Sequence, residues 1–354
     1  MNKILTVIVP MYNMEQYIEE CLQSLVVDNA EELLEVIVVN DGSTDSSSRL
    51  AHSFSDKQPN VFKVIDKANG HYGSCINTGL ASASGKYVKV LDADDYFNSP
   101  DFNDYLKLLT TCDADMVITD WAKTTIKGKP YRFRRYPEFY GKTFKIEELS
   151  PIGKFRSILM HAITYRTEML HKMGYHQPEG VCYTDDVWRF TPLTAVKTVT
   201  FYPKSIYCYR TGREGQSMDH SVMMRNAKHY LVVANHKLDI WEQVKDKVSP
   251  EVYAQMENQL IYNEGYTLKF GLVYNSIPNA TLIQLDERIK KLCPEIYDDV
   301  AHCSKFTFSF YNYIAEWRKN RSGYHFPKRW KLLVDINDFI LVMTEKYKYL
   351  FHSR

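Results

Sequence analysis

Three carboxylates crowd into four positions of the chain, as Asp92, Asp94 and Asp95. They follow an apolar run, Tyr87 to Leu91, that is typical of a buried strand ending at a sheet edge. Carboxylates this close repel one another and raise each other's pKa unless a cation or strong donors hold them. Asp92 and Asp94 are two positions apart and would share one face of a continuing strand. The segment therefore predicts a divalent metal site, with an acidic loop or helix N-cap as the alternative.

The strands and helices that must position these carboxylates follow from the hydrophobic pattern of the first hundred residues. Continuous apolar runs predict strands buried on both faces, and 3.6-type spacing between them predicts helices. Four such strands separated by helical segments indicate a doubly wound α/β sheet, in which ligands bind beyond the carboxyl ends of the strands. The strands are expected at Ile4–Val9, Glu35–Asn40, Phe62–Ile65 and Tyr87–Leu91, and the helices at Met14–Leu25, Ser46–Phe54 and Ser74–Ala83.

Composition indicates a globular protein of one or two domains. The 354 residues are 45% hydrophobic and 25% charged. With a net charge of +1, the protein has no overall positive electrostatic field that would attract nucleic acid. The seven cysteines form no CxxC pair, so we interpret them as reduced thiols in a cytoplasmic protein. The N-terminal apolar run is expected to be a strand and not a signal peptide, and no membrane span is expected.

Two common nucleotide-binding loops are missing. No GxGxxG follows the first strand, which disfavours a hydride-transfer enzyme. The segment Gly79–Lys86 has five residues between its glycines instead of four, and Tyr87 stands where a phosphate loop needs Ser or Thr. Without such a loop, the charge of a bound diphosphate would have to be neutralised by a metal.

Three motifs, each at a predicted strand end, carry a resemblance. They are Val7–Asn13 (VIVPMYN), Val38–Asp45 (VVNDGSTD) and Leu91–Tyr96 (LDADDY). In this order and spacing they resemble family 2 glycosyltransferases of the bacterial polysaccharide type, which have the GT-A (Rossmann-like) α/β fold. The resemblance covers about the first 220 residues and implies an inverting, metal-dependent hexosyltransferase.

The resemblance assigns roles to residues at the strand ends. Asp41 would accept hydrogen bonds from the uracil ring or ribose of a UDP-sugar. Pro10 and Tyr12 would line the base pocket. Asp92 would face the ribose and metal, and Asp94 would bind the Mg²⁺ or Mn²⁺ that bridges the phosphates. An Asx-turn at Asp41 and turn packing at Tyr12 are the alternatives.

The loop Asn69–Gly79 is similar to a glycine-containing loop of the family, and Asn69 is its predicted donor-binding residue. The loop departs from the family at Ile76, where many members carry Arg. A positive contact to the diphosphate is therefore expected from the segment Tyr207–Ser217, unless that segment is only a solvated loop. Its donor-binding candidates are Arg210, Arg213, Gln216 and Ser217.

The segment Tyr183–Trp188 looks like the paired acids that hold the family's catalytic base. Asp186 would take the proton of the acceptor hydroxyl on the face opposite the leaving diphosphate. Asp185 would raise the pKa of Asp186 and orient it. The alternative is a helix N-cap at Thr184 or Asp185. His161 is expected to line the acceptor side or to be structural.

We expect a glycosyltransferase domain at 1–222, with a nucleotide-binding half at 1–100 and an acceptor half at 101–222, and a helical region at 223–354. Helices are expected at Ala227–Val244, Pro250–Tyr274, Leu282–Leu292 and Lys305–Trp317. Residues 317–354 carry nine Lys or Arg against three acids, interleaved with eight aromatics. This tail suits peripheral contact with the inner face of the cell membrane or, equally, pairing in a homodimer. Nucleic acid is a poorer partner.

The expected function is transfer of a sugar from a UDP-sugar to a hydroxyl of a glycan or lipid-linked acceptor, in surface polysaccharide or glycoconjugate synthesis. Two alternatives stay open. A sugar-phosphate nucleotidyltransferase would need a glycine- and basic-rich loop after the first strand, where Pro10–Asn13 offers none. A non-catalytic glycan-binding protein of the same fold would tolerate loss of Asp94 or Asp186.

Overall fold

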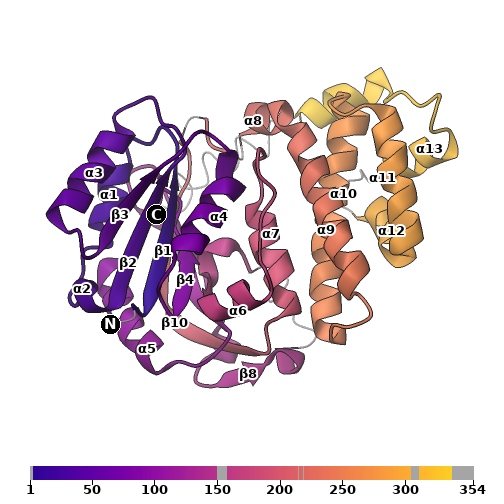
Figure 1. The fold of residues 1–354 in the computed structure, drawn as a ribbon. Helices are drawn as coiled ribbons and strands as arrows, with labels where there is room; N and C mark the ends of the chain where they lie inside the picture. The colour runs from indigo at the N-terminus through magenta and orange to yellow at the C-terminus, as the bar shows by residue number, and fades with distance from the viewer. Residues whose placement is uncertain (1–2, 150–157, 214, 218, 304–310, 337–354) are drawn as a thin grey trace. The chain divides into compact units, whose positions relative to one another are not determined.

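The computed structural model describes residues 3–149, 158–213, 215–217, 219–303 and 311–336. The chain forms two compact units, Met1–Thr211 and Gly212–Arg354, which are described separately. Figure 1 shows their strands and helices along the chain. The domain boundaries expected from the sequence, 1–222 and 223–354, stay predictions.

The first unit is built on four parallel strands, which confirms the four predicted from the apolar runs. They lie side by side in the order β3-β2-β1-β4. Most side chains of β1, β2 and β4 are buried, because helices cover both faces of a parallel sheet and leave no wet face for polar residues. Their bounds are β1 Leu5–Met11, β2 Leu34–Asn40, β3 Phe62–Asp66 and β4 Tyr87–Val90.

The connecting helices lie on both sides of these strands. Helices α1 (Ile18–Gln23) and α3 (Ser47–Lys57) lie on one side and α4 (His71–Ser82) on the other (Figure 1). A short α2 (Ala30–Leu33) precedes β2. A side chain at Gly79 would place its Cβ 2.5 Å from a methyl of Ile8, so this glycine lets α4 pack directly on β1.

The remaining strands make the sheet mixed, which the first four strands alone did not predict. Beyond β4 the order continues β9-β6-β10-β5, with β7 on β6 and β8 on β10. Strand β9 runs antiparallel to both β4 and β6, whereas β6 and β10 are parallel. The bounds are β5 Tyr96–Phe97, β6 Met116–Thr124, β7 Pro130–Arg134, β8 Thr143–Lys145, β9 Ile163–Arg166 and β10 Thr198–Arg210, and the helices are α5 Ser99–Thr111, α6 Thr167–Lys172 and α7 Asp185–Phe190.

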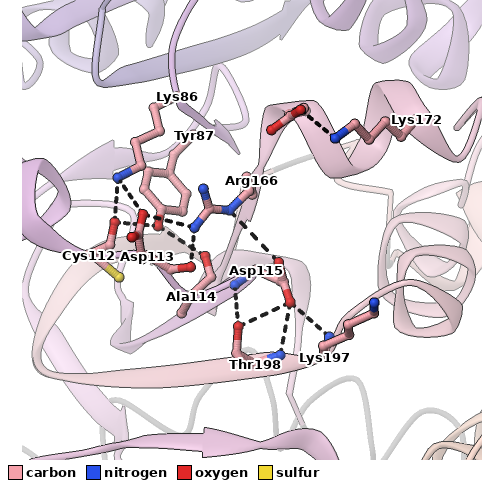
Figure 2. A network of polar contacts seen from close by, with 11 residues as sticks. Lys86, Tyr87, Cys112, Asp113, Ala114, Asp115, Arg166, Lys172, Lys197 and Thr198 are labelled. Carbon is pink, nitrogen blue, oxygen red and sulfur yellow. Dashed lines mark hydrogen bonds and ion pairs between the residues drawn. The ribbon is translucent and has the colours of Figure 1, made fainter.

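A polar network ties together the amino ends of β4, β6 and β10 and the carboxyl end of β9 (Figure 2). The Asp113 carboxylate pairs with Lys86 at 3.0 Å and Arg166 at 3.2 Å. Asp115 Oδ2 accepts the backbone amides of Lys197 at 2.9 Å and Thr198 at 3.0 Å. This edge is opposite the carboxyl ends of β1, β2 and β4, so the network fixes the sheet without occupying the predicted site.

The second unit is helical where it is described, as expected. Helices α9 and α10 span the residues predicted for them. Ser249 caps α10, with its Oγ accepting the Val252 amide at 3.3 Å, and Asn275 ends the helix in the left-handed conformation. The predicted Lys305–Trp317 helix lies partly outside the described residues. The helices are α8 His220–Arg225, α9 Ala227–Val244, α10 Pro250–Tyr274, α11 Asn279–Leu292, α12 Pro294–His302 and α13 Tyr313–Lys319.

Across the described residues, no helix has both the length and the apolar character that crossing a bilayer requires.

Candidate active site

The acidic turn after β4 is anchored by its most buried carboxylate. Asp95 is 1% exposed, and its oxygens accept the Tyr207 hydroxyl at 2.7 Å and the Arg210 backbone amide at 2.6 Å. Burial, and then the charges of Asp94 and Asp92, raise the pKa of Asp95 well above its usual range. Asp95 therefore holds the turn against β10.

The other two carboxylates of the turn, Asp92 and Asp94, lie next to Tyr72 and Arg210. Asp92 Oδ1 accepts a hydrogen bond from the Tyr72 hydroxyl at 3.0 Å. Asp94 is nine-tenths buried, and its carbonyl accepts the Arg210 Nε–H at 2.9 Å. Burial, and then the charges of the three carboxylates, raise the pKa of the Cys21 thiol. The three carboxylates thus act together on one buried thiol, which is the electrostatic setting of a cation site.

Oxygen and nitrogen ligands suited to a divalent ion meet at this turn. Carboxylate oxygens of Asp92 and Asp95 and a ring nitrogen of His161 all lie within 4.8 Å of one another. The sequence predicted Asp92 and Asp94 as the metal ligands, and the role of Asp94 stays a prediction. His161 comes from the short helix Met160–Ala162, and no local pattern in the sequence could associate it with the acidic turn.

The end of β2 carries Asp41, which organises the glycine-containing loop. Its Oδ1 accepts hydrogen bonds from Lys67 Nζ at 2.8 Å and the Gly70 amide at 2.9 Å. Its backbone carbonyl accepts the Asn69 side-chain amide at 3.0 Å. Two predicted donor-binding residues, Asp41 and Asn69, are therefore in contact. Sequence reasoning missed Lys67, whose position is decided only by the packing of this loop.

The end of β1 presents Pro10 and then Tyr12, which is 47% exposed. Asn13 follows in the left-handed region with φ 52°. Its side-chain oxygen accepts the Thr44 amide at 2.8 Å, which ties this end to the turn after β2. The predicted donor-binding residues of β1, β2 and β4 consequently share one edge, because the three strands are neighbours and parallel.

Helix α7 begins with the two acids predicted to hold the base. Asp186 Oδ1 pairs with Arg189 Nη1 at 2.9 Å, one turn along the same helix, and its side chain is 28% exposed. After burial, the charges of Asp92 and Asp185 raise the pKa of the Tyr72 hydroxyl. Tyr72 thus experiences the acidic turn and the start of α7 together, and sequence reasoning did not predict it.

Arg210 is enclosed beneath the acidic turn. Besides Asp94, its guanidinium contacts the Ile126 carbonyl at 2.8 Å and Glu20 at 2.8 Å, and its side chain is 5% exposed. The donor-binding role predicted for Arg210 stays a prediction. The same holds for Arg213, Gln216 and Ser217, which belong to the second unit.

Comparison with known proteins identifies the family. The model of Glycosyl transferase family 2 matches residues 6–174. The glycosyltransferase MG025 of Mycoplasma genitalium is 34% identical over 225 residues, covering 60% of this chain and 70% of that protein. The chain belongs to glycosyltransferase family 2. The matched segment of this family 2 chain includes the three strand-end motifs and ends before Asp185.

Two further similarities describe this family 2 chain. Glycosyltransferase GlyA of Streptococcus pneumoniae is 34% identical over 358 residues, covering 82% of this chain but only 51% of GlyA, so the chain spans about half that relative's length. The crystal structure of Staphylococcus aureus TarS 1–349 in complex with UDP-GlcNAc superposes with a TM-score of 0.62 at 19% identity. It covers 89% of this chain and 91% of TarS 1–349. The predicted GT-A α/β fold with a helical C-terminal region is confirmed.

Proposed function

We propose that this chain transfers a sugar from a UDP-sugar to a hydroxyl of a glycan or lipid-linked acceptor, with inversion at the anomeric carbon. The observation that carries the proposal is the environment of Tyr72, which connects the acidic turn to the charge of Asp185 at the start of α7. Asp92 accepts the hydrogen bond of its hydroxyl, and Asp185 is the next charge that raises its pKa. A transferase of this kind needs positive charge on the diphosphate side, such as a cation held by carboxylates, and a base on the acceptor side.

On the donor side, Asp41 and Asn69 would bind the uridine, and Pro10 and Tyr12 would line its base pocket. Asp41 is held in place by Lys67 and the Gly70 amide, so its carboxylate is ordered before a ligand arrives. Membership of family 2 and the UDP-GlcNAc held by the TarS structure support a UDP-sugar as donor.

A divalent cation fits the acidic turn, because hard carboxylate oxygens gather there and their charges act together on Cys21. Asp92 and Asp94 would hold it, and Mg²⁺ or Mn²⁺ bound there would neutralise the diphosphate. Residues of the chain hold the turn in position for the ion: Tyr207 and the Arg210 backbone amide both donate hydrogen bonds to Asp95.

On the acceptor side, Asp186 would take the proton of the attacking hydroxyl, with Asp185 beside it. Pairing with Arg189 orients the Asp186 carboxylate, and a general base must be positioned toward the proton it takes. An acid on each side of the anomeric carbon supports inversion in a single displacement.

Membrane contact is proposed for the C-terminal tail, residues 317–354. The described residues 328–336 are helical, with Leu332, Leu333 and Ile336 exposed at 66%, 43% and 45%. Lys328, Arg329 and Lys331 lie on the same helical segment, and a basic helix with exposed apolar residues suits an anionic membrane surface. Residues 337–354 of the predicted tail lie outside the described residues. Homodimer formation and a cytoplasmic location also stay predictions.

The proposal is tested by titrating the purified protein with UDP, with and without Mn²⁺, beside other nucleoside diphosphates. We expect uridine-selective binding that strengthens with the metal. With one UDP-sugar and an acceptor, we expect a glycoside product whose anomeric configuration, read by NMR, is the inverse of the donor's. Asp94→Asn should weaken the metal-dependent part of the binding by about tenfold or more, whereas Asp101→Asn, in α5, should leave it unchanged. Binding that ignores both the base and the metal would refute the proposal.

A further inference from the structure

His161 lies within a set of aromatic rings beside the acidic turn. Its ring centroid is 4.5 Å from that of Tyr209, 4.7 Å from Tyr207 and 5.0 Å from Trp121. The residue is 8% exposed. Rings packed on three sides leave the imidazole little rotational freedom, so its two nitrogens point in defined directions.

One nitrogen of this imidazole has no hydrogen-bond partner among the described residues. Nδ1 is buried and makes no hydrogen bond. The nearby ammonium of Lys89 does not serve the ring, because it donates instead to the backbone carbonyls of His161 at 2.7 Å and Ile163 at 3.2 Å. A buried, unsatisfied nitrogen is uncommon in native proteins and points to a group that binds there.

The position of the imidazole relative to the carboxylates is the decisive geometry. A ring nitrogen of His161 and oxygens of Asp92 and Asp95 lie within 4.8 Å of one another. Two ligand atoms bound at about 2.1 Å to one ion are up to about 4.2 Å apart. Only a small contraction separates this arrangement from a shared ion. Tyr72 and Tyr207 already orient the two carboxylates.

We propose that His161 supplies a nitrogen ligand to the divalent cation at the Asp92–Asp95 turn, so that the site prefers a transition ion such as Mn²⁺ or Co²⁺ over Mg²⁺. This inference rests on the proposed function, in which the turn binds a cation with UDP. Mg²⁺ favours oxygen ligands and keeps its waters, whereas transition ions accept imidazole readily. A nitrogen among the ligands therefore discriminates between ions that the carboxylates alone would treat alike.

Pulsed EPR of Mn²⁺ bound to the full chain in the presence of UDP tests the inference directly. We expect the electron spin echo to carry ¹⁴N modulation from a coordinated imidazole. Labelling the protein's histidines with ¹⁵N should change that modulation, which separates it from the nitrogens of uracil. His161→Gln should abolish it, and His176→Gln should not, because His176 is exposed and contacts Asn77 at 3.1 Å.

Competition between Mn²⁺ and Mg²⁺ gives a second readout. We expect His161→Gln to lower the preference for Mn²⁺ by about tenfold or more, with UDP selectivity against other nucleotides showing that the variant still folds. His161→Asn, which is smaller, serves if His161→Gln does not fold. Bound Mn²⁺ without histidine modulation would overturn this inference and leave a metal-dependent transferase. Absence of bound Mn²⁺ even with UDP would overturn both the inference and the metal role of the turn.

Discussion

The Tyr72 hydroxyl donates a 3.0 Å hydrogen bond to Asp92 Oδ1, which joins the first turn of α4 to the acidic turn after β4. The two residues are 20 positions apart in the chain. Burial and the two acidic groups keep the pKa of Tyr72 well above its usual range, so the hydroxyl stays a donor at every physiological pH.

Tyr72→Phe should weaken metal-dependent UDP binding by about tenfold, because a hydrogen bond to a charged group contributes about 1.5 kcal/mol and Asp92 loses its orientation. Calorimetric titration with UDP and Mn²⁺ measures this. Tyr202→Phe is the matched control, since its hydroxyl reaches only the Asp101 carbonyl at 3.5 Å. Equal binding by the two variants would show that Tyr72 does not order the turn.

Asp186→Asn should lower kcat by about 10²- to 10⁴-fold, the usual contribution of a general base, and leave the affinity for UDP nearly unchanged. Asp185→Asn should have a smaller effect on kcat. Initial rates with a soluble acceptor and parallel UDP titrations provide both numbers. If Asp185→Asn were instead the inactive variant, the base would be reassigned to the residue whose charge acts on Tyr72.

Glu264 should make the second unit less stable as the pH rises. It is fully buried in α10, its two carboxylate oxygens make no hydrogen bond among the described residues, and burial raises its pKa to about 8. Lys237 partly opposes this rise and Asp286 adds to it, with Arg288 the other charge that faces the group. Between pH 4.5 and about 8 the unfolded chain releases this proton and the folded chain keeps it, so stability falls with pH.

Thermal unfolding of wild type and Glu264→Gln from pH 5.5 to 8.5 measures this effect. The substitution keeps the shape and removes the ionisation, so we expect a flatter pH profile, with the gap over wild type growing as the pH rises. Glu295→Gln, at an exposed position in α12, should follow the wild-type curve. Parallel curves for Glu264→Gln and wild type would mean that Glu264 does not titrate in this range.

Replacing Leu332, Leu333 and Ile336 by Ser should reduce sedimentation with anionic vesicles more than transfer to a soluble acceptor, because the exposed apolar residues and the Lys and Arg beside them would contact lipid. Vesicle sedimentation and initial rates separate the two effects. Substitutions are preferable to truncation near residue 316, since Trp317 is fully buried and Arg318 pairs with buried Asp286 at 2.8 Å.

Vesicles of neutral lipid are the control that shows how much of the binding depends on attraction between the basic residues and anionic lipid. Equal loss of vesicle binding and transfer would favour a structural role for residues 328–336. A change from dimer to monomer by light scattering, with no change in vesicle binding, would favour the homodimer.

The sequence by itself determined the central strands and the edge where the site lies. Apolar runs such as those of β1 and β2 admit one arrangement, a strand covered on both faces, and the carboxyl ends of neighbouring parallel strands necessarily meet. The strand-end motifs with Asp41 and Asp92 therefore indicated both the fold and the family before any tertiary contact was known. The long helices α9 and α10 followed equally from the 3.6-type spacing of their apolar residues.

The tertiary structure alone decided which side chains surround those motifs. Tyr207 reaches Asp95 across 112 positions of sequence, and His161 arrives from a separate segment beside β9. Arg210 stands in a polar, glycine-containing segment, yet its guanidinium is enclosed beneath the turn. The burial and the contacts of a side chain depend on which strands become neighbours. The antiparallel insertion of β9 between β4 and β6 has no local sequence signal, because pairing between distant segments is set by the packing of the whole sheet.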